Sequence, residues 1–209
     1  MTPFRQLSFG LLLTAAAGMI DVVGFIELGG FYTSFMSGNT TQLGAGIARL
    51  GPQLLLPAAL ITMFFLGSFL GSLIAQSRTR GGAVGVLVLI LLSLVVSLAL
   101  RMAGFSAAQA MLALAAGAGA QNAVLTPNGA ARLGTTFVSG TLFAAGQDLA
   151  RAVRGQAPPW RWTQHLMVWA SLLVGALIGA LLYGVFAIWA ILLPGLIYVA
   201  MLVVQARHK

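Results

Sequence analysis

Two short runs of hydroxyl, amide and glycine residues stand in an otherwise apolar chain and are the first candidates for a binding site. Glycine lets the backbone approach a ligand closely, and Ser, Thr and Asn favour the start of a helix, where free N–H groups can bind an anion or a polar ligand. The alternative is that these small residues only allow tight helix packing in a membrane. We favour the binding interpretation because the pattern occurs twice. The residues of the two runs are Ser37, Gly38, Asn39, Thr40, Ser139, Gly140 and Thr141.

Asp21 lies deep in an apolar stretch and is the candidate group for proton or ion coupling. Acidic residues in membrane spans are costly and mark ion or proton paths by default. The matching position later in the chain is Asn122, which follows Gln121, and we predict that both amides line the same site. The alternative is that Asp21 is hydrogen-bonded to backbone in a helix interface, or paired with Arg49 or Arg132.

Residues suited to enzyme chemistry are scarce. His165 and His208 are the only histidines, and there is no cysteine. We find no carboxylate pair or His–carboxylate pair at a spacing that makes a metal or general acid–base site. The sequence therefore predicts no enzyme, no metal and no cofactor.

The composition is that of a multi-pass membrane protein. Of 209 residues, 59% are hydrophobic and 7% are charged, and the mean hydropathy is +0.98. Soluble domains keep about a quarter of their residues charged. The net charge of +8 arises from basic residues in short connections, which are typical of topology signals and lipid contacts rather than of nucleic-acid binding. We predict spans at about 7–27, 55–76, 83–100, 106–126, 164–183 and 185–204.

The chain also contains an internal repeat, which predicts two homologous halves, 1–104 and 105–209. Gly18 and Asp21 match Gly119 and Asn122 at an offset of 101, and the two polar runs match at an offset of 102. Each half further carries a glycine pair spaced by four, which allows close helix contact. We interpret these pairs as packing between the halves first and as a homodimer contact second. They are Gly67 with Gly71, and Gly175 with Gly179.

The number of crossings decides how the halves are related. The polar segments 34–50 and 135–151 are expensive against lipid and are better placed as re-entrant or broken helices that line a cavity. With six crossings, nine basic residues lie inside and two outside, whereas with eight the counts are eight and three. The positive-inside rule thus prefers six without excluding eight. Three crossings per half make inverted repeats, as in many secondary transporters, and four would make parallel ones; we favour inversion.

Several blocks of residues resemble the YoaK-like family of bacterial integral membrane proteins (domain of unknown function 1275). They are Gly18-x-x-Asp21-x-x-Gly24-Phe25, the run from Ser34 to Thr40, Gly119–Ala123, and the later Thr-Thr-x-x-Ser-Gly-Thr. The blocks occur in order and cover nearly the whole chain. The resemblance implies a bacterial inner-membrane protein of about six helices. It supplies no substrate and no established functional residue.

These observations together predict an all-α integral membrane protein with about six transmembrane helices and two polar half-helices that meet near the midplane. The expected function is a small-molecule or ion transporter or channel, with Asp21 as the coupling group and a polar or ionic substrate that the sequence does not identify. The alternative is a non-transporting scaffold or accessory subunit. Both termini are expected in the cytoplasm, and the lipid bilayer is the expected partner.

Overall fold

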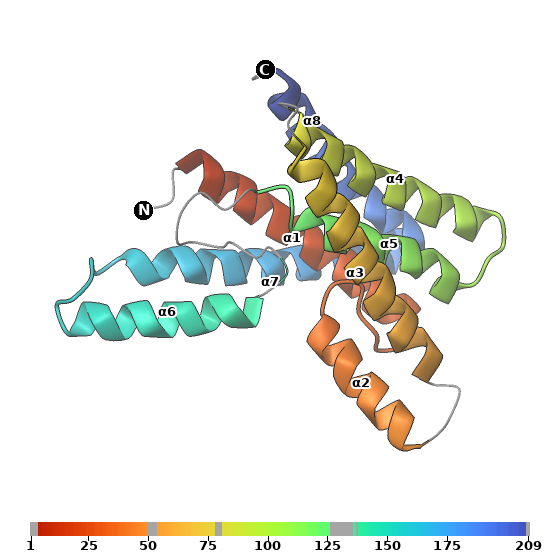
Figure 1. Ribbon diagram of the computed structural model, residues 1–209, viewed down its shortest axis with the longest axis horizontal. Coiled ribbons are helices and arrows are strands. Elements are labelled where there is room, and N and C mark those ends of the chain that lie inside the picture. The colour runs from red at the N-terminus through yellow and green to blue at the C-terminus, as the bar shows by residue number, and fades with distance from the viewer. Residues whose placement is uncertain (1–3, 50–53, 78–80, 126–135, 137, 208–209) are drawn as a thin grey trace.

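The computed structural model describes residues 4–49, 54–77, 81–125, 136 and 138–207, and these residues form helices and connections without a strand (Figure 1). The all-helical class that the sequence predicts is therefore confirmed. The helices are α1 (Phe4–Glu27), α2 (Met36–Ala48), α3 (Leu55–Ala75), α4 (Gly82–Met102), α5 (Ala107–Gln121), α6 (Val138–Val153), α7 (Arg161–Phe186), the 3₁₀ helix η2 (Ala187–Ile191) and α8 (Leu192–Arg207).

Four helical segments in the described part of the chain are long and apolar enough to cross a membrane. Three are single helices, and the fourth is the continuous run of α7, η2 and α8, which spans 47 residues. That run contains two of the predicted spans, joined by the short 3₁₀ turn. The segments are Gln6–Glu27, Leu55–Ala75, Gly82–Met102 and Arg161–Arg207.

The span predicted at 106–126 is longer than the helix that forms. Ser106 starts α5 with a capping box, accepting from the Gln109 N–H while the Gln109 side chain accepts from the Ser106 N–H. The helix ends after 15 residues, where the Asn122 side chain turns back to donate to the carbonyl of Ala118 at 3.3 Å. At 1.5 Å per residue such a helix is about 22 Å long, shorter than the ~30 Å hydrocarbon core.

Glycines bring two helix pairs into backbone contact, and each pair joins the two halves of the chain. A Cβ at Gly67 of α3 would lie 1.9 Å from the Ala116 carbonyl oxygen of α5, and a Cβ at Gly175 of α7 would lie 2.1 Å from the Ala15 carbonyl oxygen of α1. Only glycine allows such an approach. The close helix contact predicted at these glycines is confirmed, and it joins segments that are far apart in the chain.

The polar helices α2 and α6 lie at the periphery, not together. Among the described residues, α2 packs against α3 alone and α6 against α7 alone, and Figure 1 shows them projecting from different sides of the central helices. The prediction that these two segments meet is therefore wrong for this structure. The physical reason is that the glycine faces of α3 and α7 are occupied by α5 and α1, so α2 and α6 pack against other faces of these helices.

Candidate functional site

Asp21 is held by the connection that follows its own helix. After α1 the chain reverses through Gly29 and Gly30, whose φ values of +63° and +110° favour glycine. The returning segment then binds the Asp21 carboxylate. The Thr33 hydroxyl and the Ser34 backbone N–H donate to Oδ1 at 3.0 and 2.7 Å, and the Ser34 hydroxyl donates to Oδ2 at 2.8 Å.

Asn39 fixes this returning segment in place. Its Oδ1 accepts from the Tyr32 backbone N–H at 3.0 Å, and its Nδ2 donates to the Tyr32 carbonyl at 2.7 Å. The side chain is completely buried. Asn39 therefore positions the donors to Asp21 indirectly, because its hydrogen bonds join α2 to the segment that carries Thr33 and Ser34.

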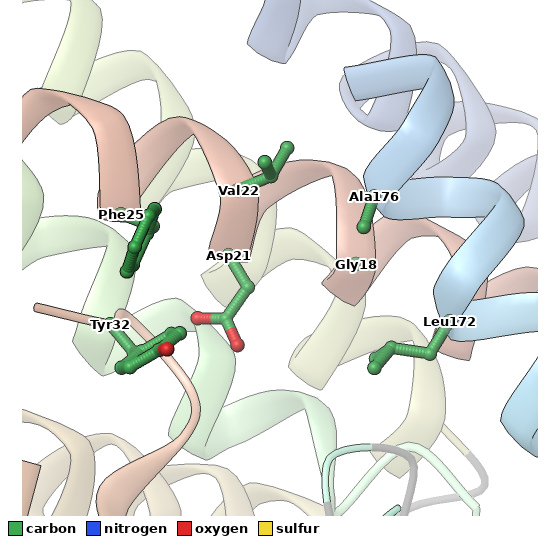
Figure 2. A pocket seen from close by; sticks show the side chains of 7 residues that line it. All are labelled: Gly18, Asp21, Val22, Phe25, Tyr32, Leu172 and Ala176. Carbon is green, nitrogen blue, oxygen red and sulfur yellow. The ribbon is translucent and has the colours of Figure 1, made fainter. Parts of the chain in front are cut away.

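A cavity of about 230 Å³ opens beside the carboxylate, between α1, α7 and the returning segment. Figure 2 shows the Asp21 carboxylate pointing between the Tyr32 ring on one side and Leu172 on the other. Apart from Asp21 and Tyr32, the lining is apolar, so the carboxylate dominates the chemistry of the cavity. The lining residues are Gly18, Asp21, Val22, Phe25, Tyr32, Leu172 and Ala176.

Within the described part of the chain, Asp21 forms no ion pair. Arg49, one of the two expected partners, is exposed at the end of α2, and Arg132, the other, lies outside the described residues. Hydrogen bonds from Thr33 and Ser34 stabilise the carboxylate instead.

A similar hydrogen bond forms at Asn122, a neutral amide. The Thr136 hydroxyl donates to the Asn122 Oδ1 at 3.2 Å, and the two residues match Ser34 and Asp21 at offsets of 102 and 101. The two positions thus share one hydroxyl hydrogen bond and differ in charge, because Asp21 is ionisable and Asn122 is not.

The remaining predicted site residues do not line the cavity. Ser37 and Thr40 are exposed on α2, and Ser139 and Gly140 are exposed on α6. Gly38 lies beside the rings of Phe35 and Tyr32. Thr141 is buried and donates to the Val138 carbonyl at 2.7 Å. Gln121 is also buried, and it donates to the Leu13 carbonyl and accepts from the Tyr198 hydroxyl.

An ionic cluster stands near each end of α7. Near its C-terminal end, the Glu27 carboxylate lies 3.5 Å from the Arg101 guanidinium and accepts from the Tyr183 hydroxyl at 2.8 Å. These three residues come from the ends of α1, α4 and α7. Glu27 therefore ties together helix ends that are far apart in the sequence.

Near the N-terminal end of α7, the buried Asp148 of α6 meets three basic groups. Its carboxylate lies 3.3 Å from Arg151 of α6, and 3.1 and 3.4 Å from Arg161 and His165 of α7. The pair with Arg151 is local, three residues apart within α6. The contacts to α7 add a link between helices.

Sequence reasoning missed the cavity walls and the donors to Asp21. Ser34 belongs to the repeated motif, and its match to Thr136 is a signal that could have identified it. Leu172 and Ala176 carry no such signal, because apolar residues fill most of α7. Only the close approach of α7 to Gly18, whose Cβ would lie 2.4 Å from the Leu172 carbonyl oxygen, brings them to the site.

Comparisons with known proteins identify the family of the chain. The family described as "Protein of unknown function (DUF1275)" matches residues 9–204. The UPF0700 transmembrane protein RA0705 of Rhizobium meliloti (strain 1021) is 32% identical over 207 residues, covering 94% of this chain and 87% of that protein. No solved structure matches the chain significantly. The family match covers nearly the whole chain and the relative is similar along its length, so the protein belongs to the DUF1275 family of transmembrane proteins, as the resemblance predicted.

Proposed function

We propose that the protein is a membrane transporter whose binding or coupling group is Asp21. The observation that carries the proposal is a carboxylate in a helix apolar enough to span a membrane, facing a cavity and paired with no basic side chain among the described residues. A buried carboxylate is expensive in a membrane, and proteins retain it where an ion or substrate passes. The proposed site lies between α1, α7 and the returning segment, and not between α2 and α6 as the sequence predicted.

The ion pair between Glu27 and Arg101 supports six crossings. Groups 3.5 Å apart lie on one side of a hydrocarbon layer about 30 Å thick. Between these residues, α3 and α4 make two crossings and return the chain to the same side. A crossing by α2 as well would place the two residues on opposite sides.

The hydrogen bond between Tyr183 and Glu27 extends the argument to the second half. Between Arg101 and Tyr183 the chain needs two crossings: α7 supplies one, and the shorter α5 together with the residues that follow it, 122–125, would supply the other. A crossing by α6 as well would separate the ends that meet at Glu27. Three crossings per half correspond to inverted repeats 1–104 and 105–209. The matching glycine contacts support the same division.

In this topology both termini lie on the cytoplasmic side of the bacterial inner membrane. Helix α2 then lies on the outer side of the membrane and α6 on the inner side. The returning segment 28–35 enters from the outer side and reaches the level of Asp21 before α2 turns outward again. Such re-entrant backbone is tolerated where it lines a cavity.

Cysteine labelling tests the topology, because the chain has no native cysteine. The exposed positions Ala48 and Gln156 are replaced separately, and intact cells are treated with a membrane-impermeant maleimide. We expect Ala48→Cys to be labelled from outside and Gln156→Cys only after lysis. Protection of both before lysis would establish the eight-span alternative.

A second labelling experiment separates a transporter from a scaffold. Val22 lines the cavity, whereas Phe65 is 67% exposed on α3, on the surface that would face lipid. A maleimide reacts with a thiolate, which forms in water and not in lipid. We expect Val22→Cys to react and Phe65→Cys to stay unreactive. Equal protection of both would mean a dry site and would favour the scaffold alternative.

The role of Asp21 is tested in proteoliposomes that carry an internal pH indicator. Under an imposed pH gradient or membrane potential, we expect wild-type flux to exceed that of Asp21→Asn. Glu27→Gln is the matched control, because it removes the other carboxylate of α1. Full flux in the Asp21→Asn protein would contradict the coupling role.

A further inference from the structure

We propose that the cavity beside Asp21 binds a small organic cation, an alkylammonium or quaternary ammonium group with short aliphatic substituents. The proposal rests on the proposed function and deepens it by naming the class of ligand. It follows from the hydrogen bonds of the carboxylate, the aromatic wall and the apolar remainder of the lining.

The hydrogen bonds to Asp21 match an ionised carboxylate that keeps one free position. A backbone N–H can only donate, so the bond from the Ser34 N–H requires an acceptor at Oδ1. Oδ1 also receives the Thr33 hydroxyl, whereas Oδ2 receives only the Ser34 hydroxyl. Each carboxylate oxygen can accept about two hydrogen bonds. Oδ2 can therefore accept a further donor or face a cation.

An aromatic wall stands beside this carboxylate. The ring centroids of Phe25 and Tyr32 are 5.2 Å apart with the planes tilted by 37°, and Phe35 packs edge-on against Tyr32 at 5.1 Å. Phe25 and Tyr32 both line the cavity (Figure 2). Aromatic faces attract cations through the ring quadrupole, and they recognise quaternary ammonium groups in particular.

The rest of the lining suits metal cations and anions less well than an organic cation. A bare metal cation needs several oxygen ligands, about six to eight for Ca²⁺, but Asp21 and Tyr32 are the only lining residues with side-chain oxygens. An anion would face the Asp21 carboxylate without a basic partner among the described residues. Alkyl substituents suit Val22, Leu172 and Ala176.

The volume limits the size of the ligand. A water molecule occupies about 30 Å³ in the liquid, so a cavity of about 230 Å³ has the volume of roughly eight water molecules. A trimethylammonium head with a two-carbon arm has this size. A peptide or a nucleotide is far larger.

Choline and 3,3-dimethyl-1-butanol form a matched probe pair, because they differ chiefly in a charged nitrogen against a neutral carbon. Binding to the purified full-length protein in detergent is measured by isothermal titration calorimetry. We expect choline to bind at least about tenfold more tightly than the alcohol. Equal binding of the two probes, or no binding of choline, would overturn the proposal without any mutation.

Variants assign the effect to the cavity. Asp21→Asn should lower the affinity for choline by at least about tenfold and leave that for the alcohol unchanged, whereas Glu27→Gln should bind choline as the wild type does. Phe25→Leu should lower the affinity for choline by about 2- to 30-fold. Phe35→Leu, which changes a ring outside the cavity lining, should lower this affinity less. Unchanged choline binding by a correctly folded Asp21→Asn protein would refute the site.

Failure of this proposal is distinguishable from failure of the transporter proposal. If choline does not bind but flux still depends on Asp21, the ligand class is wrong and transport stands. If choline binds at Asp21 but is not moved across proteoliposomes, and Val22→Cys is protected, the site binds cations in a protein that does not transport.

Discussion

Replacing Gly175 by alanine tests the close contact between α1 and α7 on which the cavity depends. The new Cβ would lie 2.1 Å from the Ala15 carbonyl oxygen, whereas ordinary contact begins at 3.4 Å. The shortfall is about 1.3 Å, and the obstructing atom belongs to backbone that cannot rotate away. The two helices must therefore separate along their contact.

The loss of stability caused by the clash can be isolated with a control substitution in the same helix. A Cβ added at Gly184 would meet nothing within 4 Å, so Gly184→Ala changes helix propensity without a clash. Propensity favours alanine over glycine by about 1 kcal/mol in either variant and cancels in the comparison. The difference between Gly175→Ala and Gly184→Ala should then equal the overpacking cost, about 1–3 kcal/mol and near the upper end because backbone is involved.

Stability is measured by reversible unfolding in mixed micelles with increasing SDS, followed by tryptophan fluorescence. Gly67→Ala should behave as Gly175→Ala does, because its Cβ would lie 1.9 Å from the Ala116 carbonyl oxygen in the matching contact. Gly175→Ala should also weaken choline binding, since Leu172 and Ala176 line the cavity. Equal stability of Gly175→Ala and Gly184→Ala would show that the helices do not pack as closely as this.

Three further substitutions test single contacts. Ser34→Ala removes the hydroxyl that donates to Asp21 Oδ2 and should cost about 1–3 kcal/mol in the same unfolding assay, because hydrogen bonds to charged groups are the stronger ones; no loss would contradict the contact. Asp148→Asn, which loses the ionic link from α6 to α7, should speed amide hydrogen exchange in α6 while leaving α1 unchanged; unaltered exchange would mean that the link does not hold α6. Ser97→Ala should be neutral or stabilising, since the buried Ser97 hydroxyl has no hydrogen-bond partner among the described residues; a loss above about 1 kcal/mol would reveal a partner.

Some features of the site could be read from the sequence because they are local or periodic. The apolar runs predicted α1, α3 and α4 to within a few residues, since about 20 apolar residues in a row have few alternatives to a membrane helix. The repeat identified Asp21, its neutral counterpart Asn122 and the paired glycines. An isolated carboxylate in such a chain is conspicuous by type alone.

The surroundings of Asp21 and the position of the polar helices were decided by tertiary structure. Asn39 and Ser37 look equally suited to bind a ligand, yet Asn39 is buried and hydrogen-bonded to the Tyr32 backbone, and Ser37 is exposed. The sequence does not record which neighbour each helix will cover, because an apolar face fits many partners. For the central helices, the glycines of α3 and α7 select α5 and α1 as neighbours, since backbone contact is available only where the shapes of two particular helices match. The sequence by itself determined the class of protein and its charged residue, and packing between distant helices decided where that charge faces a cavity.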